Sequence, residues 1–264
     1  MGTVRVAAAL AAAGFRRFST YRQATVAGAT TNIMFGFLRC YVLLSIAGSA
    51  GQLAGYDGRQ LATFVWVGQG LLAVVNAWGM LDLAERVRSG DVVTDLLRPA
   101  GPFTLYLCTD LGRFGYALLT RFLAPIAAGL LFFELYLPVE PLTYPLFAVS
   151  VVLATLIAFC GRYLIGLSAF WLLDVRGVTM MWVFLWGGAG GLYFPLPVLP
   201  EWAQLVLWIA TPFPTMMQAP LDILVERGHT GLVLLAQCVW LAIGLAACAR
   251  VQRAAWRRLV VQGG

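Results

Sequence analysis

The chain has 264 residues, of which 61% are hydrophobic and only 11% are charged. Such a small charged fraction cannot coat a soluble globule of this size, so the composition excludes an ordinary soluble protein and indicates an integral membrane protein. The net charge of +6 comes from eighteen arginines and no lysine, which is typical of anchoring charge at a membrane face rather than of nucleic-acid binding. At about 20 apolar residues per crossing, the length predicts about six spanning helices in one domain, residues 1–264.

Residues 1–23 begin the chain with a short apolar run behind Arg5, followed by Arg16, Arg17 and Arg22. The run is too short to span a bilayer, and no small-residue cleavage site leads into a polar domain, so a secretory signal is disfavoured. We expect an amphipathic helix that lies on the inner membrane surface.

Six apolar stretches then predict an all-α protein with six transmembrane helices, at residues 24–48, 61–81, 114–136, 146–173, 178–194 and 231–249. The fourth stretch is long enough that it must tilt or extend past the hydrocarbon core. Between the fifth and sixth, residues 195–230 are apolar but contain six prolines. The prolines exclude one straight helix and predict short re-entrant helices that are shielded from lipid by protein.

Arginine positions predict the orientation. With a cytoplasmic N-terminus, the inner segments hold thirteen arginines and the outer segments only Arg59 and Arg227. This bias predicts that both termini are cytoplasmic and that residues 250–264 form a basic tail that anchors to anionic lipid.

Three arginines, Arg39, Arg121 and Arg162, fall inside predicted spans. Each costs about 2.5–3.5 kcal/mol at a helix centre, so we expect them to face away from lipid. Two interpretations stay open. In the first, the arginines are structural and are satisfied by polar partners, with Glu134, Asn76, Gln69 and backbone carbonyls as candidates. In the second, they line a translocation path for an anionic or amphipathic cargo.

Residues 82–113 form the most informative loop. Ser89 or Asp91 can cap a helix start, and Pro99 stops the helix after Arg98. Apolar residues recur between these limits at helical spacing, at Val92, Val93, Leu96 and Leu97. The loop therefore predicts a short amphipathic helix in the cytosol, whose apolar stripe docks into a partner protein or, alternatively, lies on the membrane surface.

The residue inventory offers little for catalysis by the chain itself. A phosphate-binding loop of the G-x-x-x-x-G-K-[ST] type needs a lysine, so any ATP use must belong to a partner. The five cysteines are isolated and there is one histidine, which predicts neither a disulfide framework nor a zinc site. Asp82 with Glu85, and Asp91 with Asp95, are the nearest candidates for a magnesium site, but interleaved arginines favour a salt-bridged loop.

Four motifs in order give the chain a resemblance to a known family. They are "R-x-G-[DE]…LLRP" at residues 88–99, "FWL" at 170–172, "PL-x-x-LP-x-W…PF" at 195–213, and the terminal "VQGG". Together they resemble the permease subunits of type-2 ABC exporters, in the bacterial group with this loop and this C-terminus. The resemblance covers essentially the whole chain.

The resemblance implies a division of labour. The permease forms half of a dimeric translocation path, while a separate ABC ATPase subunit binds ATP and magnesium. A second, distinct permease is favoured as the other half, with a homodimer as the alternative, in a bacterial cytoplasmic membrane. The loop between spans two and three would be a coupling helix that contacts the ATPase through Glu85, Arg88, Ser89, Gly90, Asp91, Leu96, Leu97, Arg98 and Pro99. The proline-broken segment would be an outer gate that includes Pro195, Leu196, Pro200, Trp202, Pro212 and Phe213. A stand-alone transporter or channel remains the alternative to an exporter permease; an intramembrane enzyme lacks the convergent polar residues that it needs.

Overall fold

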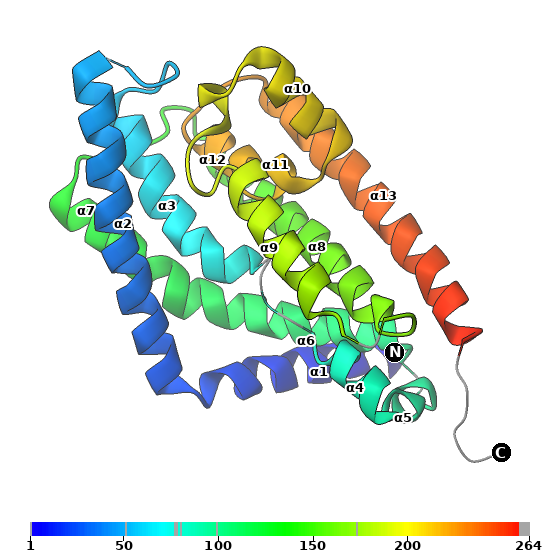
Figure 1. The fold of residues 1–264 in the computed structure, drawn as a ribbon. Coiled ribbons are helices and arrows are strands. Elements are labelled where there is room, and N and C mark those ends of the chain that lie inside the picture. Colours follow the sequence, from blue (N-terminus) through cyan, green and yellow to red (C-terminus); the bar gives the residue numbers. More distant parts are fainter. Residues whose placement is uncertain are drawn as a thin grey trace.

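The computed structural model describes residues 2–258 except positions 51, 77, 78, 80, 99 and 173, and these residues form a helical bundle (Figure 1). The first half of the chain contains α1 (Gly2–Ser19), α2 (Arg22–Ala50), α3 (Gly58–Val75), α4 (Leu83–Ser89), α5 (Val92–Leu96), α6 (Pro102–Ala117), the π-helix η1 (Leu118–Phe122) and α7 (Leu123–Phe132). The second half contains α8 (Thr143–Ser168), α9 (Arg176–Ala189), the 3-10 helix η2 (Leu196–Val198), α10 (Glu201–Ala210), α11 (Phe213–Met216), α12 (Gln218–Leu224) and α13 (Thr230–Trp256).

Four helical stretches of the described chain are long and apolar enough to cross a bilayer: Arg22–Ser49, Pro102–Phe132, Thr143–Ser168 and Thr230–Trp256. They correspond to the first, third, fourth and sixth predicted spans. The second and fifth predicted spans form α3 and α9, which are not among the four. Helix α9 has only 14 residues, and α3 ends at Val75 because Asn76 adopts a left-handed conformation with φ of 48°. The structure thus supports four spans by length and composition where the sequence predicted six.

Helix α3 is the central helix of the bundle, and every residue from Leu61 to Val75 is buried. It packs against α2, α7, η1, α6, α8 and α12. Gly70 permits a close approach of η1, because a Cβ there would lie 2.7 Å from the ring of Phe122. The first turn is fixed by a capping box, in which Asp57 Oδ1 accepts from the Gln60 amide at 2.8 Å and Gln60 Oε1 accepts from the Asp57 amide at 3.2 Å.

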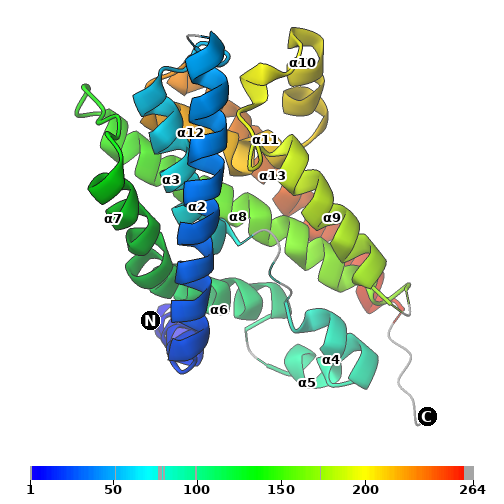
Figure 2. The ribbon, with the colours of Figure 1, turned by 60° about the vertical axis from the view of Figure 1, so that its left-hand side comes forward.

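Figures 1 and 2 show two ends of the bundle with different elements. Helices α1, α4 and α5 and the end of α13 lie at one end, which we call the α4–α5 end. Helices α10 to α12 and the loop before α3 lie at the other, which we call the α10 end. Residues 1–23, predicted as one surface helix, contain α1 and the first two residues of α2; α1 runs across the α4–α5 end and packs along α6.

Glycines set the distance between α1 and α6. A Cβ added at Gly14 would lie 2.2 Å from the carbonyl oxygen of Thr109, and one at Gly112 would lie 2.0 Å from that of Ala11. Both obstacles are backbone atoms, so larger residues would force the helices apart. Helix α6 itself begins at Pro102, twelve residues before the predicted start of the third span, and therefore includes part of the segment predicted as a cytosolic loop.

Candidate functional site

The predicted coupling helix is a pair of short helices, α4 and α5, rather than one helix. Gly90 separates them with a left-handed φ of 82°. Asp91 occupies the N-cap position of α5, but its side chain makes no cap hydrogen bond and instead accepts one from Ser89 Oγ at 2.8 Å. Leu83 at the start of α4 is fully buried and packs on α8, where a Cβ on Gly166 would lie 3.1 Å from it.

A buried carboxylate holds this pair of helices together. Asp95 is 1% exposed; its Oδ2 lies 2.6 Å from Arg86 Nε and accepts from the hydroxyl of Tyr106 in α6 at 3.2 Å. Arg86 also donates to Thr94 Oγ1 at 2.9 Å, and its bond to Asp95 raises the pKa of the guanidinium. The predicted salt bridging of the loop is therefore present, and its centre is Asp95, whose burial no sequence pattern indicates.

The outward surface of α4 and α5 combines apolar and charged side chains. Leu97 is 82% exposed and Val93 is also exposed, whereas Val92 is buried and Leu96 half-buried. Arg88, Arg98 and Glu85 are exposed beside them, with Arg88 paired to Glu85 at 3.5 Å. We call Val93, Leu97, Arg88 and Arg98 the coupling surface. Pro99, the last predicted contact, lies outside the described residues.

The predicted outer gate lies at the α10 end and consists of η2, α10, α11 and α12. Pro195, Leu196 and Phe213 are buried, Pro212 is half-buried, and Pro200 and Trp202 are exposed. The breaks between these helices are satisfied by protein groups, as predicted for re-entrant backbone. The Leu196 amide donates to Gln218 Oε1 at 3.0 Å, and Gln237 Nε2 of α13 donates to the carbonyls of Ser150 and Thr215 at 3.1 and 2.9 Å.

Four polar side chains join this outer segment to the loop before α3. Tyr56 donates to Asp222 Oδ1 at 2.6 Å, and Gln218 Nε2 donates to the same oxygen at 2.7 Å. The guanidinium of Arg227 lies 3.8 Å from the centre of the Tyr56 ring, which is a cation–π contact. Burial of its carboxyl raises the pKa of Asp222 from 3.8 to about 6, and burial beside Asp222 raises the pKa of Tyr56.

Glu226 has the opposite environment only four residues later. It accepts from the Tyr136 hydroxyl at 2.5 Å, from Thr143 Oγ1 at 2.8 Å and from the amides of Val139 and Glu140 at 3.1 and 2.8 Å. Hydrogen bonds to the charged form, chiefly that from Tyr136, lower the pKa of Glu226 to about 2. The carboxylate thus organises the loop between α7 and α8.

At the opposite end of α3, three charged side chains form a buried network. Asp110 Oδ1 accepts from Arg113 Nε at 2.7 Å, and its Oδ2 accepts from Arg162 Nη2 at 2.7 Å; all three side chains are at most 7% exposed. Arg113 also donates to the carbonyls of Ala73 and Val74 at 2.7 and 3.1 Å, which are among the last in α3. These carbonyls have no intrahelical partner, so the guanidinium acts as a C-terminal cap.

This network corrects two sequence-based assignments. Arg113 belongs to residues 82–113, which the sequence predicts as a cytosolic loop, but it is buried in α6 together with Asp110. Arg162 is paired with Asp110 and with none of the three predicted side chains. Of those, Glu134 pairs with Arg59 at 2.6 Å. The spacing of three residues between Asp110 and Arg113 was the available signal, because such residues meet on one helix face.

The other two predicted intramembrane arginines are less completely satisfied. Arg39 of α2 donates through Nη2 to the carbonyl of Leu192, while its Nε and Nη1 are buried without a partner among the described residues. Arg121 in η1 makes no hydrogen bond or ion pair with any described residue, and its Nε is buried. Backbone carbonyls, one of the predicted alternatives, therefore satisfy Arg39 in part and Arg121 not at all.

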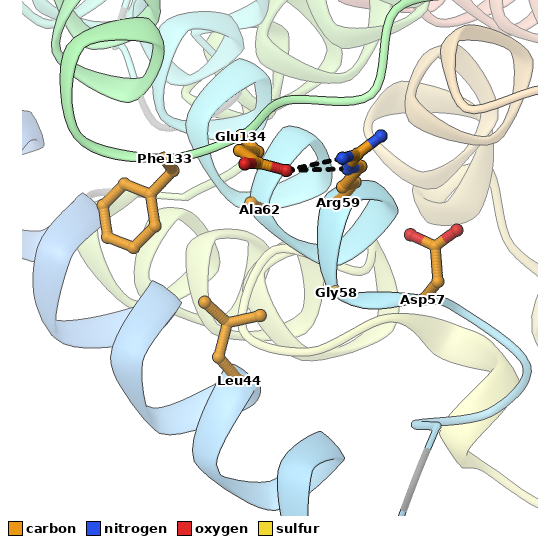
Figure 3. A pocket seen from close by; sticks show the side chains of 7 residues that line it. All are labelled: Leu44, Asp57, Gly58, Arg59, Ala62, Phe133 and Glu134. Carbon is orange, nitrogen blue, oxygen red and sulfur yellow. Dashed lines mark hydrogen bonds and ion pairs between the residues drawn. The ribbon is translucent and has the colours of Figure 1, made fainter.

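Three cavities lie near these charged groups. One of about 520 Å³ at the α10 end is lined by Arg59 and Glu134, which already pair with each other (Figure 3). Two others, of about 340 and 300 Å³, lie below the end of α3 and share Phe18, Asn76 and Arg113 in their walls. No group of three or more potential metal ligands occurs among the described histidine, cysteine, aspartate and glutamate residues.

An all-helical chain with four apolar helices long enough to cross a bilayer is a multi-pass membrane protein. A family model described as ABC-2 family transporter protein matches residues 31–263, so the chain belongs to the ABC-2 family of transporter membrane proteins. No curated protein and no solved structure matches the chain. The family's membrane subunits are typically not themselves catalytic, and membership implies an ATPase partner in general.

Proposed function

We propose that this chain is the transmembrane subunit of an ATP-driven ABC exporter and receives the ATPase through α4 and α5. The family match over residues 31–263 carries this proposal. The coupling surface supports it, because Leu97 is the most exposed large apolar side chain at the α4–α5 end and stands between two exposed arginines. Buried Asp95 of α5 pairs with Arg86 of α4 and accepts a hydrogen bond from Tyr106 of α6. These contacts attach α4 and α5 to α6, so a force applied to α5 is transmitted to the bundle.

The proposed topology has six spans, with α3 and α9 as the second and fifth, and places the α4–α5 end in the cytoplasm of a bacterial cell. Helix α3 is surrounded by other helices, which lets it be shorter than a lipid-facing span. Helix α9 packs mainly on α11 and exposes Met180, Met181 and Phe184, as a helix that faces lipid would. The proline-broken segment at the α10 end would then be the outer gate. The arginine bias supports this orientation, since Arg59 and Arg227 are at the α10 end.

The proposed complex needs two partners. An ABC ATPase subunit supplies the ATP and magnesium sites, and a second permease supplies the other half of the translocation path, with a heterodimer favoured. The test is purification of the tagged full chain from its native membrane in mild detergent, followed by mass spectrometry of stoichiometric partners. Recovery of an ATPase with a lysine-containing phosphate loop supports the proposal. Recovery of the intact chain alone, with no ATPase cross-linked to α5, would make a stand-alone transporter the better hypothesis.

A variant sharpens the test of the coupling surface. Leu97→Asp places a charge where an apolar contact is proposed, and it should weaken recovery of the ATPase about tenfold, as loss of a central interface contact does. Val139→Asp is the matched control, because Val139 is 78% exposed in the loop at the α10 end. Equal recovery with both variants would contradict coupling through this surface.

A further inference from the structure

The elbow between α1 and α2 encloses a basic cavity that the proposed function does not use. The cavity measures about 300 Å³ and is lined by Arg113 and Arg121 together with aromatic and small side chains, among them Phe18, Tyr21 and Tyr116. The described residues that line it include no carboxylate. The adjoining cavity of about 340 Å³ brings Arg162 and Asp110 to its other side.

The charge around this cavity is not balanced. Four arginines line the two cavities, Arg17, Arg113, Arg121 and Arg162, against two carboxylates, Asp82 and Asp110, which leaves two uncompensated positive charges. Asp110 is already shared by two guanidinium groups, and Arg121 has no partner among the described residues. Arg121 is half-buried with its Nε fully buried, and a desolvated cation without an anion is costly, so the cavity favours an anionic ligand. Guanidinium donors match the oxygen geometry of phosphate in particular.

The position of the cavity indicates what carries the phosphate. Ala24 and Thr25, in the first turn of the candidate span Arg22–Ser49, line it, while α1 runs across the end of the bundle (Figure 1). This level corresponds to the boundary between lipid headgroups and acyl chains. Phe18 and Tyr21 in its wall are exposed, as aromatic residues at a membrane interface are. A ligand held here places its charge on the arginines and an apolar tail toward lipid.

The geometry points to a binding site for the phosphate of an anionic phospholipid, with Arg121 as its ligand and the positive charge of Arg113 beside it. Arg121 projects from the widened turn of η1 and lies against Gly28 of α2. A Cβ on Gly28 would be 2.1 Å from Arg121 Nη2. Glycine at this position therefore makes room for the guanidinium at the cavity wall. π-Helical turns inserted in α-helices are frequent at functional sites.

Native mass spectrometry of the full chain, purified in neutral detergent, tests the site. The chain is offered phosphatidylglycerol or phosphatidylcholine, and lipid retained per chain is measured. Wild type should retain phosphatidylglycerol in preference. Arg121→Gln should weaken that retention about tenfold, the loss expected for a charge-assisted hydrogen bond. Arg121→Lys should restore part of it. Gly28→Ala should weaken retention with all charges kept, because it displaces the guanidinium.

Arg59→Gln is the matched control, since it removes an exposed arginine at the other end of the bundle and should leave retention unchanged. Each variant is compared at an equal midpoint of thermal unfolding. Retention of phosphatidylglycerol by Arg121→Gln at the wild-type level would overturn the site. Binding of inorganic phosphate with no preference for phosphatidylglycerol would overturn a lipid as the source. No nucleotide or partner subunit is needed, so the outcome is independent of the exporter proposal.

Discussion

The two ends of α3 are both terminated by ionic side chains, but they are built from different parts of the chain. At its N-terminus, Asp57 caps the helix through Gln60, three residues away. At its C-terminus, Arg113 reaches carbonyls that are 40 and 39 residues away in sequence and is held by Asp110. The signs of charge match the helix dipole, with an anion at the N-terminus and a cation at the C-terminus. The N-terminal end of α3 is thus specified locally and the C-terminal end by tertiary packing.

The largest expected loss of stability is at the C-terminal end of α3. Asp110→Asn removes the one carboxylate that two buried arginines share, and breaking a buried ion pair costs about 3–5 kcal/mol. We expect a large fall in the midpoint of thermal unfolding in detergent. Glu134→Gln, which breaks the exposed pair with Arg59, is the control and should cost about 0–1 kcal/mol. A similar fall of the unfolding midpoint in the two variants would show that the network around Asp110 is solvated rather than buried.

A smaller loss of stability is expected at the N-terminal end of α3. Asp57→Ala removes the side-chain cap of α3 and leaves the Gln60 amide unpaired, which costs about 1 kcal/mol. The same unfolding measurement checks it, and Asp57→Ser, which can still accept from that amide, should recover most of the loss. If Asp57→Ala lowered the free energy of unfolding as much as Asp110→Asn does, the exposed cap would contribute as much stability as the buried ion pair, which would contradict this comparison.

A dependence of stability on pH is also expected at the α10 end. The pKa of Asp222 is raised to about 6 in the folded protein from 3.8, so its protonated form is favoured by folding and stability should fall as pH rises from about 4 to 6. The lowered pKa of Glu226 has the opposite sign, with stability lost as pH falls from about 4.5 to 2. Unfolding midpoints across this range measure both.

Two variants separate these contributions. Asp222→Asn should flatten the upper part of the profile, and Glu226→Gln the lower part. A profile that keeps its upper slope in Asp222→Asn would place the titrating group elsewhere.

The long helices were predictable because continuous apolar sequence specifies them. The predicted span at 24–48 is α2, and that at 231–249 lies within α13. The proline-broken segment was also predictable, since proline removes backbone donors locally. The end of α3 was not, because Asn76 lies in an uncharged stretch and the helix stops where Arg113 from another element takes its carbonyls.

The candidate site was predictable only where its chemistry is local. The exposed Leu97 and its neighbouring arginines follow from the loop motif, but the division into α4 and α5 depends on the left-handed Gly90. Asp110 and Arg113 were assigned to a cytosolic loop because charge alone does not distinguish a solvated residue from one neutralised in the interior. The pairing of Asp110 with Arg162, 52 residues away, depends on how α6 packs against α8 and is not visible in the local sequence.

The close packing of α1 on α6 has a mechanical consequence. At Gly14 and Gly112 the two backbones are in direct contact. Arg17 of α1 also forms an ion pair at 2.5 Å with Asp82, the residue just before α4. Helix α1 is thus joined to the coupling elements at one point and to α6 along its length. In the proposed exporter, a displacement of α4 by the ATPase would therefore be transmitted sideways through α1 to the elbow at α2.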